Sequence, residues 1–141
     1  MDTLVKKRWE QWIERIDDKD LIRELQSIGM DWNQIEDCFY KELEFGTGGL
    51  RGVIGVGTNR INVYTVAKVS QGYANYLLKN FFNPSVAIAF DSRIKSDEFA
   101  KVVAEVLVAN GIRVYIYHEL MPTPCLSYAI RYLKCSGGVV I

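Results

Sequence analysis

Four glycines and one arginine lie together in the segment FGTGGLRG, residues 45–52. Glycine adopts backbone angles that other residues rarely reach, so main-chain N–H groups in such a segment can approach a ligand closely. The guanidinium of Arg51 presents a planar fork of N–H donors that matches the oxygens of a phosphate group. We therefore interpret Thr47, Gly48, Gly49 and Arg51 as a candidate phosphate-binding site. The alternative is a simple turn beside a surface arginine.

The spacing of these glycines separates the segment from two common nucleotide-binding motifs. A Walker A loop needs a Gly-Lys-Ser/Thr sequence, which does not occur here. The dinucleotide-binding pattern G-x-G-x-x-G is also broken, because Arg51 stands where its third glycine should be. The segment therefore favours a phosphate group over a whole nucleotide as the ligand.

A second pair of charged residues, Asp91 and Arg93, directly follows the uniformly apolar stretch 86–90. At the carboxyl end of a buried parallel strand, Asp91 can accept hydrogen bonds from loop N–H groups, and Arg93 can reach an anion. An internal Asp–Arg pair that pins the loop is the alternative interpretation. Thr123, which lies between two prolines, is interpreted as a helix cap, and His118 as a structural residue.

The elements that must position these residues begin with a helical region. Apolar residues recur at helical spacing from Val5 to Ile16, with charged residues between them. Asp20 is a candidate N-cap for a second helix that Gly29 would end, and Asp31 can start a third helix that reaches Leu43. We predict that residues 1–44 form an N-terminal helical extension whose three tryptophans pack internally.

Strands and helices alternate in the remainder, residues 45–141, which predicts a three-layer α/β/α sandwich with a mostly parallel sheet. The loops after Phe90, Tyr117 and Ile141 should share one edge of that sheet. The expected elements are a helix over 65–79 with an apolar face of Val66, Val69, Tyr73, Tyr76 and Leu77, a strand over 86–90, a helix capped by Ser96 and ended by Gly111, a strand over 113–119, a helix opened by Pro124, and a strand over 138–141.

The composition narrows the classes of partner. The chain has 141 residues, with 17 basic residues against 17 acidic ones, so no global charge attracts nucleic acid or an anionic membrane. No apolar run is long enough for a signal peptide core or a membrane span. The three cysteines lack metal-motif spacing and indicate thiols in a reducing compartment, and a single histidine excludes multi-histidine metal sites.

The order of the motifs FGTGGLRG, AFDSR, MPTPCLSYAI and SGGVVI strongly resembles the first domain of the α-D-phosphohexomutases, the family of phosphoglucomutases and phosphomannomutases. The resemblance runs from about Glu42 to Ile141. The approach ELEFGTGGLRG, together with the helical extension, looks most like the phosphoglucomutase branch that includes phosphopentomutase-type enzymes. The resemblance implies an isomerase of carbohydrate metabolism located in the cytoplasm.

This resemblance implies transfer of a phosphoryl group between the 1- and 6-positions of a hexose phosphate, through a phosphoserine and a bisphosphorylated intermediate. Mg²⁺ and an activator of the glucose 1,6-bisphosphate type are implied as well. Arg51 matches the family arginine beside the phosphoserine, where it would neutralise charge on the transferring group. Asp91 and Arg93 match a family D-x-R motif to which we assign support of the active-site loop.

The family's serine loop, metal-binding segment and sugar-recognition loop would all follow Ile141, where this sequence stops. We therefore expect an N-terminal fragment that is inactive alone, whose partners are a phosphorylated sugar and the missing domains. An exposed inter-domain face should favour self-association. Two alternatives remain open at this point: a stand-alone module that binds a phosphorylated ligand, and a purely structural domain. The preferred sugar is not specified by these residues.

Overall fold

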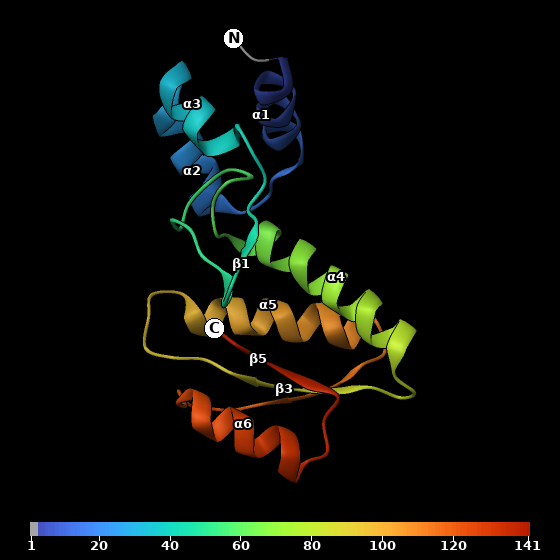
Figure 1. The fold of residues 1–141 in the computed structure, drawn as a ribbon. Helices are drawn as coiled ribbons and strands as arrows, with labels where there is room; N and C mark the ends of the chain where they lie inside the picture. The colour runs from blue at the N-terminus through green and yellow to red at the C-terminus, as the bar shows by residue number, and fades with distance from the viewer. Residues whose placement is uncertain (1–2) are drawn as a thin grey trace. The chain divides into compact units, whose positions relative to one another are not determined.

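The computed structural model describes residues 3–141, which form two compact units. The first unit ends at Thr65, and the second runs from Val66 to Ile141. Figure 1 shows the helices and strands of both units. None of the helices in the described part of the chain combines the length and the apolar character that crossing a bilayer requires.

Three helices open the first unit, as the sequence predicts, and they are α1 (Thr3–Arg15), α2 (Lys19–Ile28) and α3 (Trp32–Phe39). The expected cap of α2 is wrong by two positions. Asp18, not Asp20, is the N-cap, because its carboxylate accepts from the amides of Asp20 and Leu21 at 3.0 and 2.9 Å. Gly29 ends α2 with a positive φ of 57°, as expected.

Asp31 begins α3, which confirms that prediction, and its carboxylate accepts from the amides of Asn33 and Gln34. The helix ends at Phe39, so Leu43 lies outside it, contrary to expectation. The tryptophans pack internally, with Trp9 edge-on to Trp32 at 5.5 Å between ring centroids. The buried core of this unit consists of Val5, Leu21, Leu25, Ile35, Cys38, Phe39 and Val56.

A short antiparallel hairpin and the start of α4 complete the first unit. The hairpin pairs β1 (Phe45–Gly46) with β2 (Gly49–Leu50). The long helix α4 (Val63–Asn80) begins in the first unit and continues into the second.

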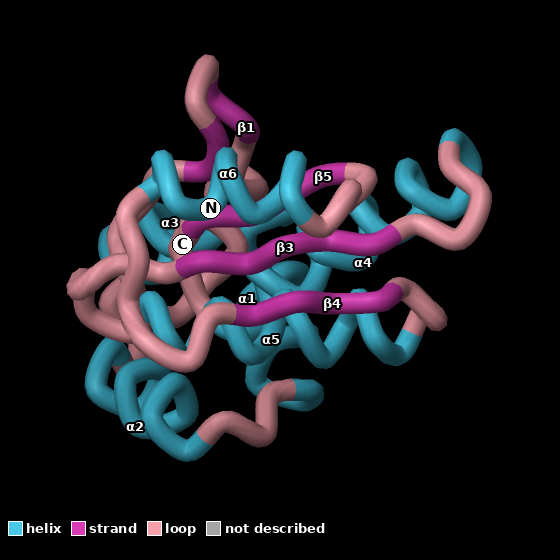
Figure 2. The backbone as a smooth tube through the Cα atoms, turned by 90° about the horizontal axis from the view of Figure 1, so that it is seen from below, coloured by secondary structure: helices cyan, strands magenta, loops and turns pink. Residues whose placement is uncertain are grey.

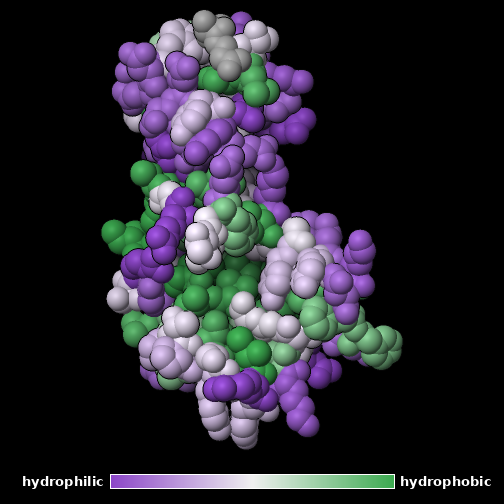
Figure 3. Space-filling model, viewed as in Figure 1, coloured by the Kyte–Doolittle hydropathy of each residue, from purple (hydrophilic) through white to green (hydrophobic). Residues whose placement is uncertain are grey.

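On the face drawn in Figure 3, the N-terminal helices present mostly hydrophilic side chains, whereas hydrophobic ones gather where Figure 1 shows α5.

The second unit contains a three-stranded parallel sheet in the order β4-β3-β5. Its register places Ala87 opposite Tyr115 on one side and Gly138 on the other. Figures 1 and 2 show α6 on one face of the sheet and α4 and α5 on the other, which confirms the three-layer arrangement. The elements after α4 are β3 (Ser85–Ala89), α5 (Ser96–Ala109), β4 (Arg113–Ile116), α6 (Thr123–Tyr132) and β5 (Gly137–Val140).

Strand β3 is the centre of this sheet. Every residue from Val86 to Ala89 is buried, because β3 has a strand on each side and helices over both faces. A uniformly apolar run is typical of such a strand, and the prediction made from its letters is confirmed. The three strands are parallel, so their carboxyl ends meet at one edge, as expected.

The predicted apolar face of α4 is partly wrong. Tyr76 is 56% exposed and lies against the ring of Phe81 instead of the core. The buried residues of α4 are Val66, Ser70, Ala74 and Leu77. Two of them, Ser70 and Ala74, are small, and small side chains allow a helix to pack closely. Tyr73 is half-buried, with its hydroxyl over Gly137, where a side chain would collide with it.

Two predicted caps are also wrong. Lys95, in the left-handed conformation with φ 64°, occupies the cap position of α5, and Ser96 is the first helical residue. The Ser96 hydroxyl donates instead to Asp91, whose ionised carboxylate is a strong acceptor. At α6 the cap position belongs to Pro122, and Thr123 makes no capping hydrogen bond. Pro124 removes one of the N–H groups that a capping side chain would bind.

Candidate functional site

The glycine-rich segment forms the β1–β2 hairpin, with Phe45 opposite Leu50 and Gly46 opposite Gly49. Thr47 and Gly48 make the two-residue turn between the strands. Gly49 has a φ of +119°, which side-chain-bearing residues rarely adopt, although a Cβ there would meet no atom within 4 Å. The backbone angle, rather than space, therefore requires a glycine at this position.

Arg51 follows β2, and its side chain turns back toward the hairpin turn. A Cβ built on Gly48 would lie 3.6 Å from Nη2 of Arg51, so the guanidinium and the turn backbone are neighbours. The side chain is exposed and has no hydrogen bond or ion pair with any of residues 3–141. Its N–H groups are thus available to an anion that lies beside the turn.

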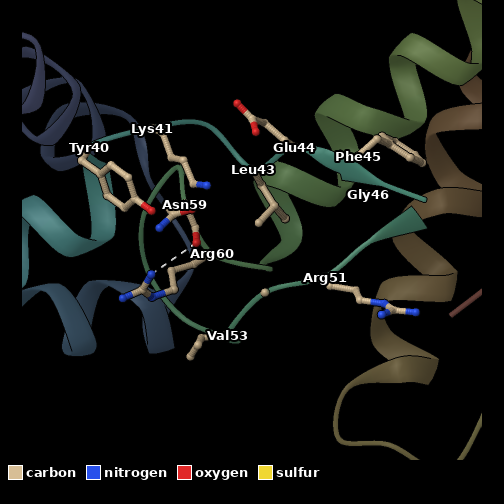
Figure 4. Close-up of a pocket in the computed structure, with 11 residues that line it drawn as sticks. Tyr40, Lys41, Leu43, Glu44, Phe45, Gly46, Arg51, Val53, Asn59 and Arg60 are labelled. Atoms are coloured by element: carbon tan, nitrogen blue, oxygen red, sulfur yellow. Dashed lines mark hydrogen bonds between the residues drawn. The ribbon is translucent and has the colours of Figure 1, made fainter. Parts of the chain in front are cut away.

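A pocket of about 360 Å³ lies at the base of this hairpin, within the first unit. Its lining combines Lys41 and Glu44, before the hairpin, with Arg51 and Arg60, after it. Figure 4 shows the guanidinium of Arg51 directed away from the group formed by Tyr40, Asn59 and Arg60. The part of the Arg51 side chain nearest the backbone therefore lines the pocket, whereas the guanidinium of Arg51 lies beside the hairpin turn.

The other arginine of the pocket is already neutralised. Arg60 forms an ion pair with Asp37, and its Nη1 donates to the main-chain carbonyls of Asp37 and Asn59 at 3.3 Å each. Lys41 contacts the ring face of Tyr40, with 5.5 Å between Nζ and the ring centroid. Arg60 consequently serves to fix the pocket wall, which leaves Arg51 as the better candidate for an anion.

The second predicted pair lies in the loop after β3, in the second unit. The Arg93 Nε atom donates to Asp91 Oδ2 at 2.8 Å, and the Arg93 amide donates to Asp91 Oδ1 at 3.0 Å. Ser96 adds a third hydrogen bond to Asp91 Oδ1, also at 3.0 Å. The amide of Arg93, followed by the Ser96 hydroxyl and the Arg93 guanidinium, holds the pKa of Asp91 below its ordinary value of 3.8.

Backbone hydrogen bonds join this loop to its neighbours at the carboxyl edge of the sheet. The Asp91 amide donates to the Ile141 carbonyl at 2.9 Å, and the Met121 amide donates to the Phe90 carbonyl at 2.9 Å. The ends of β3 and β5 and the segment before α6 therefore meet around residues 90–91. Asp91 and its partners fix a loop at the edge where parallel sheets usually carry their ligands.

The predicted site residues thus fall into two groups, one in each unit. Thr47, Gly48, Gly49 and Arg51 share one hairpin of the first unit, and Asp91 and Arg93 share one loop of the second. His118 is largely exposed and lies 3.9 Å from the carboxylate of its neighbour Glu119, so it is a surface residue and not a core one.

Residues that hold the segment after Arg51 were missed by the sequence analysis. Glu24 of α2 accepts a hydrogen bond from the amide of Val56, and nothing in the local sequence indicates this contact. Asn62 could have been found, since an Asn directly before a helix is a common N-cap. Its Oδ1 accepts from the amides of Tyr64 and Thr65 at 3.2 and 3.0 Å.

No cluster of three or more His, Cys, Asp or Glu side chains suited to a metal ion occurs among residues 3–141. The acceptors of Asp91 already serve three donors, and Asp37 is paired with Arg60. The residues of the described part of the chain therefore do not fit a Mg²⁺ site by themselves.

Comparison with known proteins places these features in one family. Residues 42–141 match the family model described as phosphoglucomutase/phosphomannomutase, alpha/beta/alpha domain I. This range includes the hairpin, Arg51 and the loop of Asp91 and Arg93.

Curated relatives agree with that match. A phosphoglucomutase of Staphylococcus haemolyticus is 44% identical over 106 residues, which are 75% of this chain and 19% of the relative. A phosphoglucomutase of Staphylococcus epidermidis is 38% identical over 130 residues, 92% of this chain and 23% of the relative. The chain thus spans about a fifth of the length of these relatives.

A solved structure shows the same fold. The crystal structure of a Thermus thermophilus protein, assigned as a phosphomannomutase, superimposes with a TM-score of 0.65 at 32% sequence identity. The superposition covers 71% of this chain and 22% of the Thermus chain.

Proposed function

Since the chain belongs to the phosphoglucomutase/phosphomannomutase family and matches its domain I, we propose that it forms the first domain of a phosphosugar mutase. The reaction we propose for the whole enzyme is transfer of a phosphoryl group between the 1- and 6-positions of a hexose phosphate. The names of the staphylococcal relatives, phosphoglucomutase, support glucose phosphate as the first substrate to test.

The observation that carries this proposal is the position of Arg51. Its exposed guanidinium lies beside the Gly48 backbone and is bound to no other group among the described residues. In phosphoryl transfer, protein groups act chiefly by positioning the reactants and by stabilising charge on the equatorial oxygens. Arg51, with the turn of Thr47, Gly48 and Gly49, provides donors for those oxygens, so we assign it the role of catalytic arginine.

The remaining chemistry belongs to residues outside this chain. We propose a phosphoserine that passes its phosphoryl group to the free hydroxyl of the sugar phosphate, which gives a bisphosphate. The serine then takes up the other phosphoryl group, and the isomeric monophosphate leaves. A glucose 1,6-bisphosphate-type activator keeps the serine phosphorylated. We assign the Mg²⁺ site to the other domains, because the described residues offer no metal cluster.

For Asp91 and Arg93 we propose loop support. Their hydrogen bonds are satisfied within the loop and by Ser96, which favours a positioning role over direct contact with substrate. The loop is tied to Ile141, the residue after which the family's serine loop is expected. The cytoplasmic location and the self-association through an exposed inter-domain face stay predictions.

The proposal is tested with the product of the complete reading frame, incubated with glucose 1-phosphate, Mg²⁺ and a trace of glucose 1,6-bisphosphate. Phosphorus NMR should show conversion to glucose 6-phosphate. The 141-residue chain at equal molarity should show none, and turnover by it would refute our placement of the nucleophile outside the chain.

A second arm of the experiment separates an enzyme from a binding module. Inorganic phosphate is titrated into the 141-residue chain, and the Arg51 side-chain resonance is followed by NMR. If the complete product is inactive and the chain still binds phosphate at Arg51, the chain is a phosphate-binding module and the mutase proposal fails.

A further inference from the structure

The segment that follows Arg51, residues 53–62, forms a closed loop in the same compact unit as α2 and α3. The Ile61 amide donates to the Val53 carbonyl at 2.8 Å, and the Gly55 amide donates to the Ile61 carbonyl at 3.1 Å. These two hydrogen bonds close loop 53–62 at its foot, which adjoins Arg51 and Gly52 in the chain. The loop is therefore the support from which the hairpin extends.

Helix α2 holds the first part of this loop through one carboxylate. Oε2 of Glu24 accepts a hydrogen bond from the amide of Val56 at 3.1 Å, and Val56 is fully buried. The backbone of Gly55 presses against the same carboxylate, since a Cβ there would lie 2.6 Å from Oε1 of Glu24. The carboxyl group of Glu24, and a glycine whose lack of a side chain leaves room for that group, thus join α2 to loop 53–62.

The end of α3 and the segment after it hold the second part of the loop. The Asn59 amide donates to the Cys38 carbonyl at 3.0 Å, and Gly57 packs directly on that carbonyl. Thr58 Oγ1 donates to the Lys41 carbonyl at 2.7 Å. The carbonyl of Cys38, in the last turn of α3, and that of Lys41, just after the helix, thereby gain partners from the loop.

Asn62 makes loop 53–62 rigid from within, and Gly52 fixes the junction between this loop and the hairpin. Nδ2 of Asn62, a residue only 2% exposed, donates to the carbonyls of Gly55 and Gly57 at 2.8 and 3.0 Å. A Cβ on Gly52 would lie 2.8 Å from a methyl group of Leu43, so the chain is tightly packed at the residue next to Arg51. Displacement of the loop would therefore move Arg51.

From these contacts we infer that the N-terminal helices are a positioning device for Arg51, and that Glu24 is its principal positioning residue. This inference rests on the proposed function and adds a role for the helices in it. Glu24 acts through Val56 and the loop backbone, and it does not touch the proposed substrate. A catalytic group displaced by about 1 Å can lose on the order of a hundredfold in rate, so a rigid support has a measurable effect.

The test uses two variants that loosen the loop from opposite sides and two that restore each contact. Glu24→Ala and Thr58→Val each remove a hydrogen bond to the loop, whereas Glu24→Gln and Thr58→Ser keep an acceptor or a donor in place. Gln26→Ala, on the exposed side of α2, is the matched control. In the complete enzyme, kcat and KM for glucose 1-phosphate are measured for all five.

We expect Glu24→Ala to lower kcat about tenfold or more with KM changed less than about twofold, because chemistry, not substrate capture, depends on where Arg51 lies. Thr58→Val should act in the same direction, and the two conservative variants should recover most of the rate. Folded variants with wild-type kcat, or an increase in KM alone, would overturn the inference.

Hydrogen exchange on the 141-residue chain gives a readout that does not depend on activity. Amides of residues 45–52 should exchange faster in Glu24→Ala and Thr58→Val than in the wild type and in Gln26→Ala. Unchanged exchange in the hairpin would overturn the positioning role even if the complete enzyme is active. Faster exchange together with an inactive wild-type enzyme would support the positioning role and reject the proposed function.

Discussion

The amide of Asp91 donates a hydrogen bond to the carbonyl of Ile141 at 2.9 Å, and the amide of Ile141 donates to Ala89 at 3.0 Å. The loop after β3 and the end of β5 are therefore tied together by main-chain bonds at the carboxyl edge of the sheet. The side chain of Asp91 adds two hydrogen bonds from Arg93 within the same loop and one from Ser96, the first residue of α5. Asp91 thus connects the end of β5 to the N-terminus of α5 through Ser96.

We expect Ser96→Ala to destabilise the second unit by about 1 kcal/mol, the usual cost of losing one hydrogen bond. The Ser96 hydroxyl is buried, and its partner is the ionised carboxylate of Asp91. Urea unfolding followed by circular dichroism measures the change. Ser92→Ala, at an exposed position in the same loop, should stay within about 0.5 kcal/mol of the wild type. Equal effects of the two substitutions would contradict the role given to Ser96.

The stabilising effect of the Asp91 carboxylate should depend on pH. The pKa of Asp91 is lowered in the folded protein from its ordinary value of 3.8, first by the Arg93 amide. Folding therefore favours the ionised form of Asp91. The contribution of this carboxylate to the free energy of unfolding is complete above pH 3.8 and is lost as the pH falls through the pKa of the folded protein.

The measurement compares unfolding of wild type and Asp91→Asn across the acid range. The difference in unfolding free energy should be constant above about pH 5 and should shrink below pH 3.8. The side chain is 41% exposed, so the difference at neutral pH will be modest. Ser92→Ala should follow the wild-type profile, and a difference that grows on acidification would reverse the proposed sign.

Much of this fold could be predicted because its signals are local. The run of apolar residues from Val86 to Ala89 specifies a buried parallel strand, and Asp31 and Gly29 mark helix ends through short-range hydrogen bonds and backbone angles. The hairpin of residues 45–52 was recognisable as a candidate site because its glycines and Arg51 adjoin in the chain.

Contacts between distant segments could not be predicted in this way. Glu24 and Val56 are separated by 32 residues, and only the folded first unit brings them together. The buried face of α4 was also misjudged, since Ser70 and Ala74 are buried whereas Tyr76 is 56% exposed. Ser96 was misassigned because Asp91 competes for its hydroxyl.

Gly57→Ala should destabilise the first unit by about 2 kcal/mol or more. Gly57 has a φ of +125°, and a Cβ there would lie 2.4 Å from the Cys38 carbonyl oxygen, a backbone atom that cannot move aside. Trp9, Trp12 and Trp32 all lie in this unit, so tryptophan fluorescence in urea follows its unfolding.

Gly46→Ala is the matched control for Gly57→Ala. A Cβ at Gly46 would lie 3.5 Å from the Gly49 carbonyl, an ordinary contact distance, and its φ is not positive. We expect this variant to stay within about 0.5 kcal/mol of the wild type. A similar loss in both variants would show that the close approach to Cys38 has no special cost.

Arg51→Ala should lower kcat of the complete enzyme by about 100- to 1000-fold, the range found when one donor to a developing charge is removed. Arg51→Lys should recover only part of this loss, because an ammonium group keeps the charge but not the planar fork that matches phosphoryl oxygens. Phosphorus NMR of glucose 1-phosphate conversion gives the rates. Arg23→Lys, at a side chain 75% exposed on α2, should leave kcat unchanged. Wild-type turnover in Arg51→Ala would remove Arg51 from the catalytic site.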